Sequence, residues 1–165
     1  MWLLYLRTYI RNQKSNTDYI GIVDASGHGV GGVVFEELST CTPVVFRWEW
    51  PDNIKQDIIL LTNPTGRLTN SDLEMVGLVI LWLVIEGVYH NLCKKRVTLF
   101  SDNSPTVSWV TRLASKWLLV AEQLVQALAL CLKAMHACPL TPMHIKGKRN
   151  KIANVPLQSF GSNPA

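Results

Sequence analysis

The fold of this chain is indicated first by one segment, Gly21-Ile-Val-Asp-Ala-Ser-Gly-His-Gly-Val-Gly-Gly-Val-Val-Phe35. An apolar run that starts at Tyr19 predicts a short strand ending at Asp24. The glycine-rich residues 28–32 predict a tight turn, after which residues 33–35 resume as a strand. Asp24 is therefore expected at the edge of a sheet, where a strand gives way to a turn.

Two more carboxylates stand at the boundaries of apolar elements. Glu74 lies in Thr69-Asn-Ser-Asp-Leu-Glu-Met75, and Asp102 lies in Val97-Thr-Leu-Phe-Ser-Asp-Asn-Ser104. Asn70 or Ser71 is expected to cap a helix that carries Glu74 in its first turn. Apolar residues at i, i+3 and i+4 spacing predict that this helix is largely buried.

Asp24 and Asp102 each follow an apolar strand. If the two strands are parallel neighbours, both carboxylates emerge at the end of the sheet where α/β proteins bind ligands, and Glu74 can point to the same place. Three converging acids repel one another unless cations bind, and hard oxygen ligands favour Mg²⁺ or Mn²⁺. Such a site can activate water for in-line phosphoryl displacement, especially with two ions about 4 Å apart. Any one of these acids alone is adequately explained as a cap or turn residue.

The remaining pattern predicts an α/β domain with a mixed sheet. After the two strands above we expect a third apolar stretch at residues 41–50, a loop at 52–67, the Glu74 helix, a strand at 97–101, helices at 104–115 and 117–135 ended by Pro139 and Pro142, a strand at 143–146 and a helix at 150–160. Residues 1–16 are expected to form an N-terminal helical extension, and residues 17–165 the domain itself.

Composition is consistent with this prediction. The chain has 165 residues, of which 48% are hydrophobic and 17% charged, as in a compact globular domain. The net charge of +4 is mild, but no acid follows Glu122. The basic residues beyond that point are Lys133, Lys146, Lys148, Arg149 and Lys151. A basic C-terminal part beside an acidic cluster suits a polyphosphate partner, although a solvated face explains each lysine singly.

The four cysteines show no paired spacing of the kind typical of zinc sites. Cys131, His136, Cys138 and His144 allow a zinc site, but Cys131 lies in an apolar run, so free thiols in a reducing compartment are favoured. No secretory signal is recognised, and the apolar run at residues 75–85 is about half the length of a membrane span. We therefore expect an intracellular protein, cytoplasmic or nuclear, with no membrane partner.

Four motifs in this order resemble type 1 ribonuclease H domains, particularly the version in retroelement reverse transcriptases. They are Asp24-Ala-Ser26 with the glycine turn, Thr69-Asn-Ser-Asp-Leu-Glu74, Ser101-Asp-Asn103, and His144-Ile-Lys-Gly-Lys-Arg-Asn150 followed by Ala153-Asn154. The resemblance spans most of residues 19–160. It implies the ribonuclease H-like fold, a mixed five-stranded sheet with helices on both faces.

The resemblance also implies roles for individual residues. Asp24 would be shared by two Mg²⁺ ions, for which Mn²⁺ can substitute, and Glu74 and Asp102 would complete the ion on the leaving-group side. Substrate contacts are implied for Ser26, Asn70, Ser71, Asn103, Lys146, Lys148, Arg149 and Asn150. Of these, Asn70 and Ser71 would read the minor groove of the hybrid, where the RNA 2′-hydroxyl groups lie.

Asn154 departs from the family pattern, because it stands where the family has the acid that holds the water-activating ion. An amide oxygen can coordinate Mg²⁺ but adds no charge, and its NH₂ group cannot face a cation. We expect weaker binding of that ion and reduced turnover with the fold intact. The last loop also lacks the histidine with which many family members assist product release, and His144, on the preceding strand, is expected to be structural.

The resemblance implies a Mg²⁺-dependent endonuclease that hydrolyses the RNA strand of RNA/DNA hybrids and works beside a reverse transcriptase domain. The alternative, favoured by Asn154 and by the isolated N-terminal helix, is a catalytically reduced module that binds nucleic acid or supports a polymerase. A third interpretation is an integrase or transposase of the same superfamily. It requires a late glutamate, and no acid follows Glu122.

Overall fold

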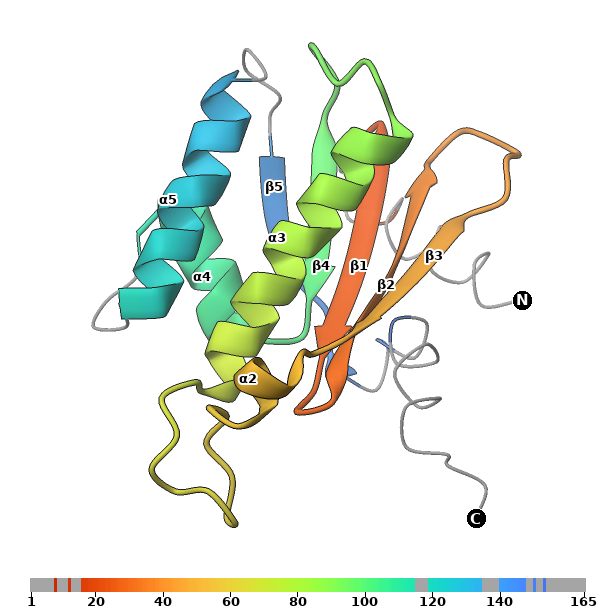
Figure 1. Ribbon diagram of the computed structural model, residues 1–165. Coiled ribbons are helices and arrows are strands. Elements are labelled where there is room, and N and C mark those ends of the chain that lie inside the picture. Colours follow the sequence, from red (N-terminus) through yellow and green to blue (C-terminus); the bar gives the residue numbers. More distant parts are fainter. Residues whose placement is uncertain are drawn as a thin grey trace, which may run out of the picture.

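The computed structural model describes residues 16–114, 119–134 and 140–147, together with Thr8, Asn12, Asn150 and Ala153. The elements run in the order β1 (Tyr19–Ala25), β2 (Gly29–Glu36), β3 (Val44–Glu49), α2 (Asp52–Lys55), α3 (Asn70–Val88), β4 (Val97–Ser101), α4 (Ser104–Arg112), α5 (Leu119–Ala134) and β5 (Leu140–His144) (Figure 1). The N-terminal helix expected at residues 1–16 falls outside the described residues, apart from Thr8, Asn12 and residue 16.

The five strands form one sheet in the order β3-β2-β1-β4-β5. β1 pairs antiparallel with β2 and β2 antiparallel with β3, whereas β4 lies parallel to both β1 and β5. The expected mixed five-stranded sheet is therefore confirmed, and so is the parallel pairing of the strands that precede Asp24 and Asp102. β1 lies at the centre of the sheet and is buried along its whole length.

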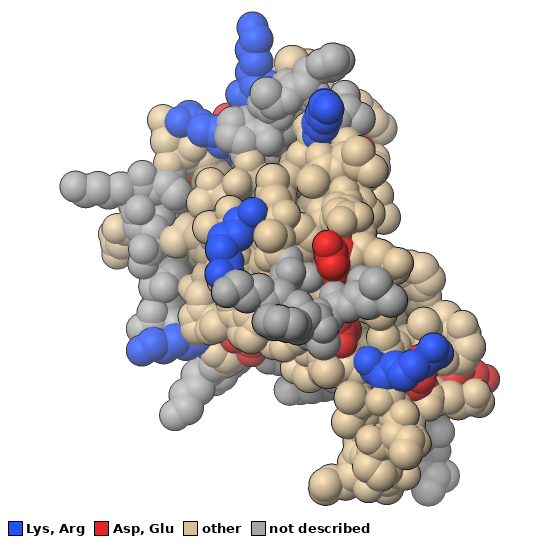
Figure 2. Space-filling model, turned by 90° about the vertical axis from the view of Figure 1, so that its left-hand side faces the viewer, with Lys and Arg blue, Asp and Glu red and all other residues tan. Residues whose placement is uncertain are grey.

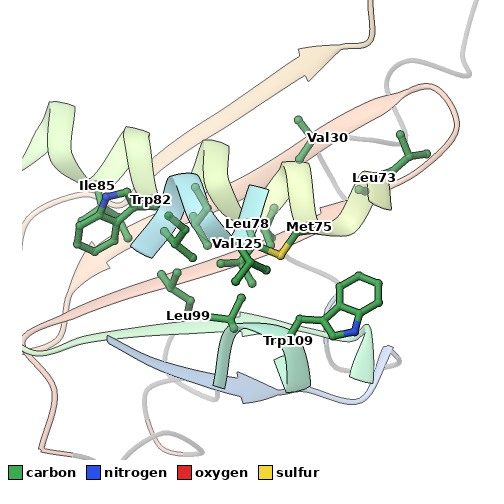
Figure 3. Packing of buried hydrophobic residues seen from close by; sticks show 14 of the residues in the cluster. Val30, Leu73, Met75, Leu78, Trp82, Ile85, Leu99, Trp109 and Val125 are labelled. Carbon is green, nitrogen blue, oxygen red and sulfur yellow. The ribbon is translucent and has the colours of Figure 1, made fainter. Parts of the chain in front are cut away.

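Helices α3, α4 and α5 lie over one face of the sheet (Figure 1), where the larger core cluster forms. Figure 3 shows this cluster with Trp82 and Ile85 at one end and Trp109 at the other. A smaller cluster on the opposite face joins β1, β2 and β4 to the last loop; its members are Ile20, Ile22, Val33, Phe35, Phe100, Ile145 and Ala153. Burial on both faces explains why β1, β2 and β4 read as nearly continuous apolar runs.

The N-cap of helix α3 lies one residue before the first of the two residues expected to cap it. Thr69 is the N-cap, and it forms a capping box in which its side chain accepts a hydrogen bond from the backbone N–H of Asp72 while the Asp72 carboxylate accepts from the backbone N–H of Thr69. The expected caps Asn70 and Ser71 are instead the first helical residues, and Glu74 lies in the second turn. The prediction failed because Thr69, Asn70 and Ser71 are all good N-cap residues. The choice among them depends on the acid three residues after the cap, which for Thr69 is Asp72.

Several other boundaries differ from expectation. The glycine turn is shorter, because β2 already begins at Gly29 and the Ser26 N–H donates to the Gly29 carbonyl. Pro142 does not end a helix but lies in β5, which starts three residues before the predicted strand. A proline is tolerated there because β5 is an edge strand. The predicted loop at residues 52–67 contains the short helix α2, the helix predicted at 104–115 ends at Arg112, and the third strand is confined to Val44–Glu49.

The helix expected at residues 150–160 lies outside the described residues except for Asn150 and Ala153. Among the helices that the structure describes, none has the length and apolarity needed to span a membrane.

Candidate metal centre

Strand register brings Asp24 and Asp102 together. In the parallel pairing of β1 with β4, Ile22 lies opposite Phe100. Two residues further along each strand the same face presents Asp24 and Asp102, because side chains alternate with a period of two. Glu74 reaches the same point from α3, and one carboxylate oxygen from each of the three acids lies within 4.8 Å of the others. The predicted convergence of the three acids is therefore present.

Backbone and side-chain donors hold Glu74 in place. The Ala25 N–H donates to Glu74 Oε1 over 3.2 Å, and the Ser101 hydroxyl donates to Glu74 Oε2 over 3.4 Å. Ser101 in turn accepts a hydrogen bond from the backbone N–H of Asn103. Glu74 thus spans the ends of β1 and β4, and its side chain is only 2% exposed.

The loop after β5 closes against Asp102. An added Cβ on Gly147 would lie 2.9 Å from Asp102 Oδ2, so a side chain at this position would displace the Asp102 carboxylate. The amide nitrogen of Asn150 donates to the Val23 carbonyl, which ties the same loop to β1. His144 Nε2 lies 3.0 Å from the Asp102 carbonyl oxygen. This contact agrees with the expectation that His144 has a structural role.

The environment disfavours charge on all three acids. Burial, together with the charge of Asp102, raises the pKa of Asp24 to about 7. Burial and the two neighbouring aspartates raise the pKa of Glu74 to about 8. Burial also raises the pKa of Asp102, which the nearby His144 opposes. The charged forms of the three carboxylates therefore repel one another in a partly buried site, and a bound cation would relieve this repulsion.

The residues fit a hard divalent cation. Within the described part of the chain, no Lys or Arg forms an ion pair with Asp24, Glu74 or Asp102. The atoms available to coordinate a metal are all carboxylate oxygens, the ligand type that suits Mg²⁺ and Mn²⁺. The zinc alternative gains no support from the described residues, in which these three acids are the only such cluster; His136 and Cys138 lie outside them.

The predicted substrate-binding residues surround this centre unevenly. Asn70 is exposed at the start of α3 and Lys146 is exposed after β5, whereas Asn150 is fully buried. Asn150 therefore ties the last loop to β1 through the Val23 carbonyl, and its implied contact with substrate stays a prediction. Lys148, Arg149 and Asn154 lie outside the described residues.

The other predicted contacts form local hydrogen bonds. Asn103 is the N-cap of α4, where its side chain accepts from the Thr106 N–H, and its amide donates to the Ser71 hydroxyl. Ser26 is half-buried at the end of β1, where its carbonyl accepts from the Trp50 indole N–H. Asn103 and Ser71 thus join the N-termini of α3 and α4 next to the acids.

Two contributors to the site were missed from the sequence. Ser101 supports Glu74, and its position directly before Asp102 was the available signal. Gly147 packs against Asp102, and nothing in the sequence distinguishes it from an ordinary loop glycine. Both act through contacts between segments that are distant in the chain.

Comparison with protein-family models and with curated proteins gave no match. Solved structures do match. LC11-RNase H1, isolated from compost by a metagenomic approach, superposes with a TM-score of 0.60 at 15% identity, covering 86% of this chain and 93% of that chain. The fold is that of ribonuclease H. At this level of identity the similarity establishes the ribonuclease H-like fold alone.

Two further structures share the ribonuclease H-like fold. LC11-RNase H1 in complex with an RNA/DNA hybrid matches with a TM-score of 0.59 at 16% identity, covering 83% of this chain and 91% of that chain. Prototype foamy virus protease-reverse transcriptase matches with a TM-score of 0.52 at 14% identity. In this last case the match covers 92% of this chain but 22% of that chain.

Proposed function

We propose that this protein is a metal-dependent endonuclease that hydrolyses the RNA strand of RNA/DNA hybrids. The observation that carries the proposal is the convergence of Asp24, Glu74 and Asp102 within 4.8 Å at one end of a ribonuclease H-like sheet. The same fold in LC11-RNase H1 has been solved with an RNA/DNA hybrid, which supports this substrate class.

The three acids would hold Mg²⁺, with Mn²⁺ as a substitute. When bound, divalent ions lower the pKa of a coordinated water and neutralise charge on the phosphate. The chain itself supplies the orientation: the Ala25 N–H and the Ser101 hydroxyl fix Glu74, while Gly147 allows the last loop to close over Asp102. The raised pKa values of Asp24 and Glu74 mean that cation binding must displace protons near neutral pH.

Substrate recognition is proposed for the polar groups beside the acids. Asn70 and Ser71, at the exposed start of α3, would donate to and accept from the 2′-hydroxyl groups and base edges of the minor groove. Ser26, Asn103 and Lys146 border the same end of the sheet, and Lys148 and Arg149 are proposed to lie near phosphate groups.

Asn154 is proposed as the fourth metal ligand, at a position where a carboxylate would bind the ion more strongly. The neighbouring Ala153 is fully buried with Ile22 and Phe100, the residues that precede Asp24 and Asp102 by two positions. This packing supports a place for residue 154 near the metal centre. An amide in that position reduces the charge available to the water-activating ion.

A retroelement origin and an adjoining reverse transcriptase domain belong to the same proposal. The match to prototype foamy virus protease-reverse transcriptase, of which it covers 22%, supports an arrangement in which such a domain forms part of a longer chain. We also propose that residues 1–16 form an N-terminal extension, that residues 17–165 form the domain, and that the protein is intracellular.

The test uses a labelled RNA/DNA hybrid incubated with the full chain in Mg²⁺ and then in Mn²⁺. Wild type is expected to cleave the RNA strand, leaving a 5′-phosphate and a 3′-hydroxyl, and Asn154→Asp is expected to cleave about 10-fold faster or more. Asp24→Asn should abolish cleavage. If wild type and Asn154→Asp are both inert in both metals, the nuclease proposal is wrong, and retained binding would instead favour a nucleic-acid-binding module.

A further inference from the structure

A projecting loop with an apolar tip lies between α2 and α3. This apolar finger, residues 57–68, extends beyond the bottom of the sheet in Figure 1. Three successive apolar side chains in its first half, termed the apolar tip, are exposed to water: Ile59 is 43% exposed, Leu60 48% and Leu61 104%. On the face shown in Figure 2, the projection at the bottom carries Lys, Arg, Asp or Glu side chains only near its base.

Hydrogen bonds hold the finger in one shape. The Ile59 N–H donates to the Leu68 carbonyl over 2.8 Å, and the Leu68 N–H donates to the Asp57 carbonyl over 2.9 Å. The Asn63 side-chain amide donates to the Gln56 and Ile58 carbonyls, and Arg67 forms an ion pair with Asp57 at the base. Ile58 is buried at 3% exposure and anchors the loop to the core. The tip is therefore held out by a built scaffold.

The finger adjoins the metal centre. Leu60 Cδ2 lies 4.0 Å from the place where a Cβ on Gly27 would stand, and Gly27 is in the turn that follows Asp24. At its other end, Leu68 is followed directly by Thr69, the cap of the helix that carries Glu74. The finger therefore contacts the turn that follows Asp24 and leads directly into the cap of α3.

We propose that Ile59, Leu60 and Leu61 pack against the sugars of the nucleic-acid duplex in its minor groove, next to the cleavage position. This inference rests on the proposed function and specifies how that substrate is held. Exposed apolar side chains on a fixed scaffold mark a binding surface, and Leu and Ile are among the side chains that minor-groove proteins insert. The minor groove of an A-form duplex is wide and shallow enough to admit them.

The lack of unpaired charge on the finger predicts how its loss affects the salt dependence of binding. Between Ile58 and Gly66 it carries no charged residue, and Arg67 at its base is paired with Asp57. A contact through the tip therefore adds affinity without releasing counterions. Its loss should weaken binding and leave the dependence of affinity on salt unchanged.

The decisive measurement is the affinity of the full chain for a fluorescent RNA/DNA hybrid, made in an Asp24→Asn background so that the hybrid persists. The double substitution Leu60→Ser with Leu61→Ser is expected to raise Kd about 10-fold, as loss of partial burial of two leucines implies. The slope of log Kd against log salt should stay unchanged. Leu130→Ser is the control, because Leu130 is 68% exposed on α5 and lies outside the finger. A photoreactive benzoylphenylalanine at position 61 should crosslink to the hybrid, and one at position 130 should not.

The outcomes separate the two proposals. If the parent binds hybrid and the finger variant binds within two-fold of it with no crosslink from position 61, the inference is wrong, as it would be if the finger served a protein partner. If the parent binds no hybrid at all, both the inference and the proposed function are wrong.

Discussion

The clustered carboxylates make the metal-free protein less stable as pH rises, and Asp24→Asn should remove much of this effect. Burial and Asp102 raise the pKa of Asp24 from 3.8 to about 7. A group whose pKa is higher in the folded state contributes stability that is fully present below the unfolded pKa and is lost as pH rises through the folded pKa. For Asp24 the loss therefore falls between about pH 4 and pH 7, and for Glu74 it extends to about pH 8.

The size of the effect follows from the shift. A change from 3.8 to about 7 corresponds to about 4 kcal/mol as an upper bound, at roughly 1.36 kcal/mol per pKa unit, and solvent screening of this partly exposed carboxylate reduces it. Asn has nearly the shape of a protonated Asp and does not titrate. Asp24→Asn should therefore match wild type near pH 4 and exceed its unfolding free energy by up to about 4 kcal/mol at pH 8, in the absence of metal.

The assay is urea unfolding in EDTA at pH 4.5, 6, 7 and 8, with the unfolding free energy extrapolated to water. Glu122→Gln, on the exposed surface of α5, controls for loss of one negative charge. Added Mg²⁺ should restore stability to wild type near pH 8 and give less to Asp24→Asn. A metal-free wild type whose stability does not decline between pH 4.5 and pH 8, or an Asp24→Asn variant that declines as steeply as wild type, would contradict a raised pKa of Asp24.

Three further predictions address the scaffold around the site. Gly147→Ala should lower cleavage at least 10-fold while the melting temperature changes little, because the new methyl group lies 2.9 Å from Asp102 Oδ2. Gly87→Ala is the matched control, because a Cβ at Gly87 would have no atom within 4 Å. Equal activity of the two variants would contradict the close packing of Gly147 against Asp102. Thr69→Ala should cost about 1 kcal/mol in urea unfolding through loss of the capping box, and the same cost for Thr65→Ala in the exposed loop would argue against capping. Gly32→Ala should destabilise by more than about 2 kcal/mol, since its Cβ would lie 2.6 Å from the Ile22 carbonyl oxygen, and near-native stability would show that β2 can shift away from β1.

The sequence alone predicted the mixed sheet and the meeting of Asp24, Glu74 and Asp102. It could do so because alternation within strands and the position of an acid after an apolar run are local properties, and parallel strands share one carboxyl end. The same local signals predicted the buried α3 and the β4 strand. They failed at the boundaries: the cap of α3, the start of β2 and the place of Pro142 each depend on a partner that lies elsewhere in the sheet or helix.

The tertiary structure decided what surrounds the acids. Ser101 supports Glu74, Gly147 lies against Asp102, and the buried Asn150 donates to the Val23 carbonyl. It also showed that part of the loop predicted at residues 52–67 forms, with Leu68, a hydrogen-bonded finger with exposed apolar side chains. Periodicity reports which face of an element is buried, whereas the distance between two side chains far apart in the chain depends on how the elements pack.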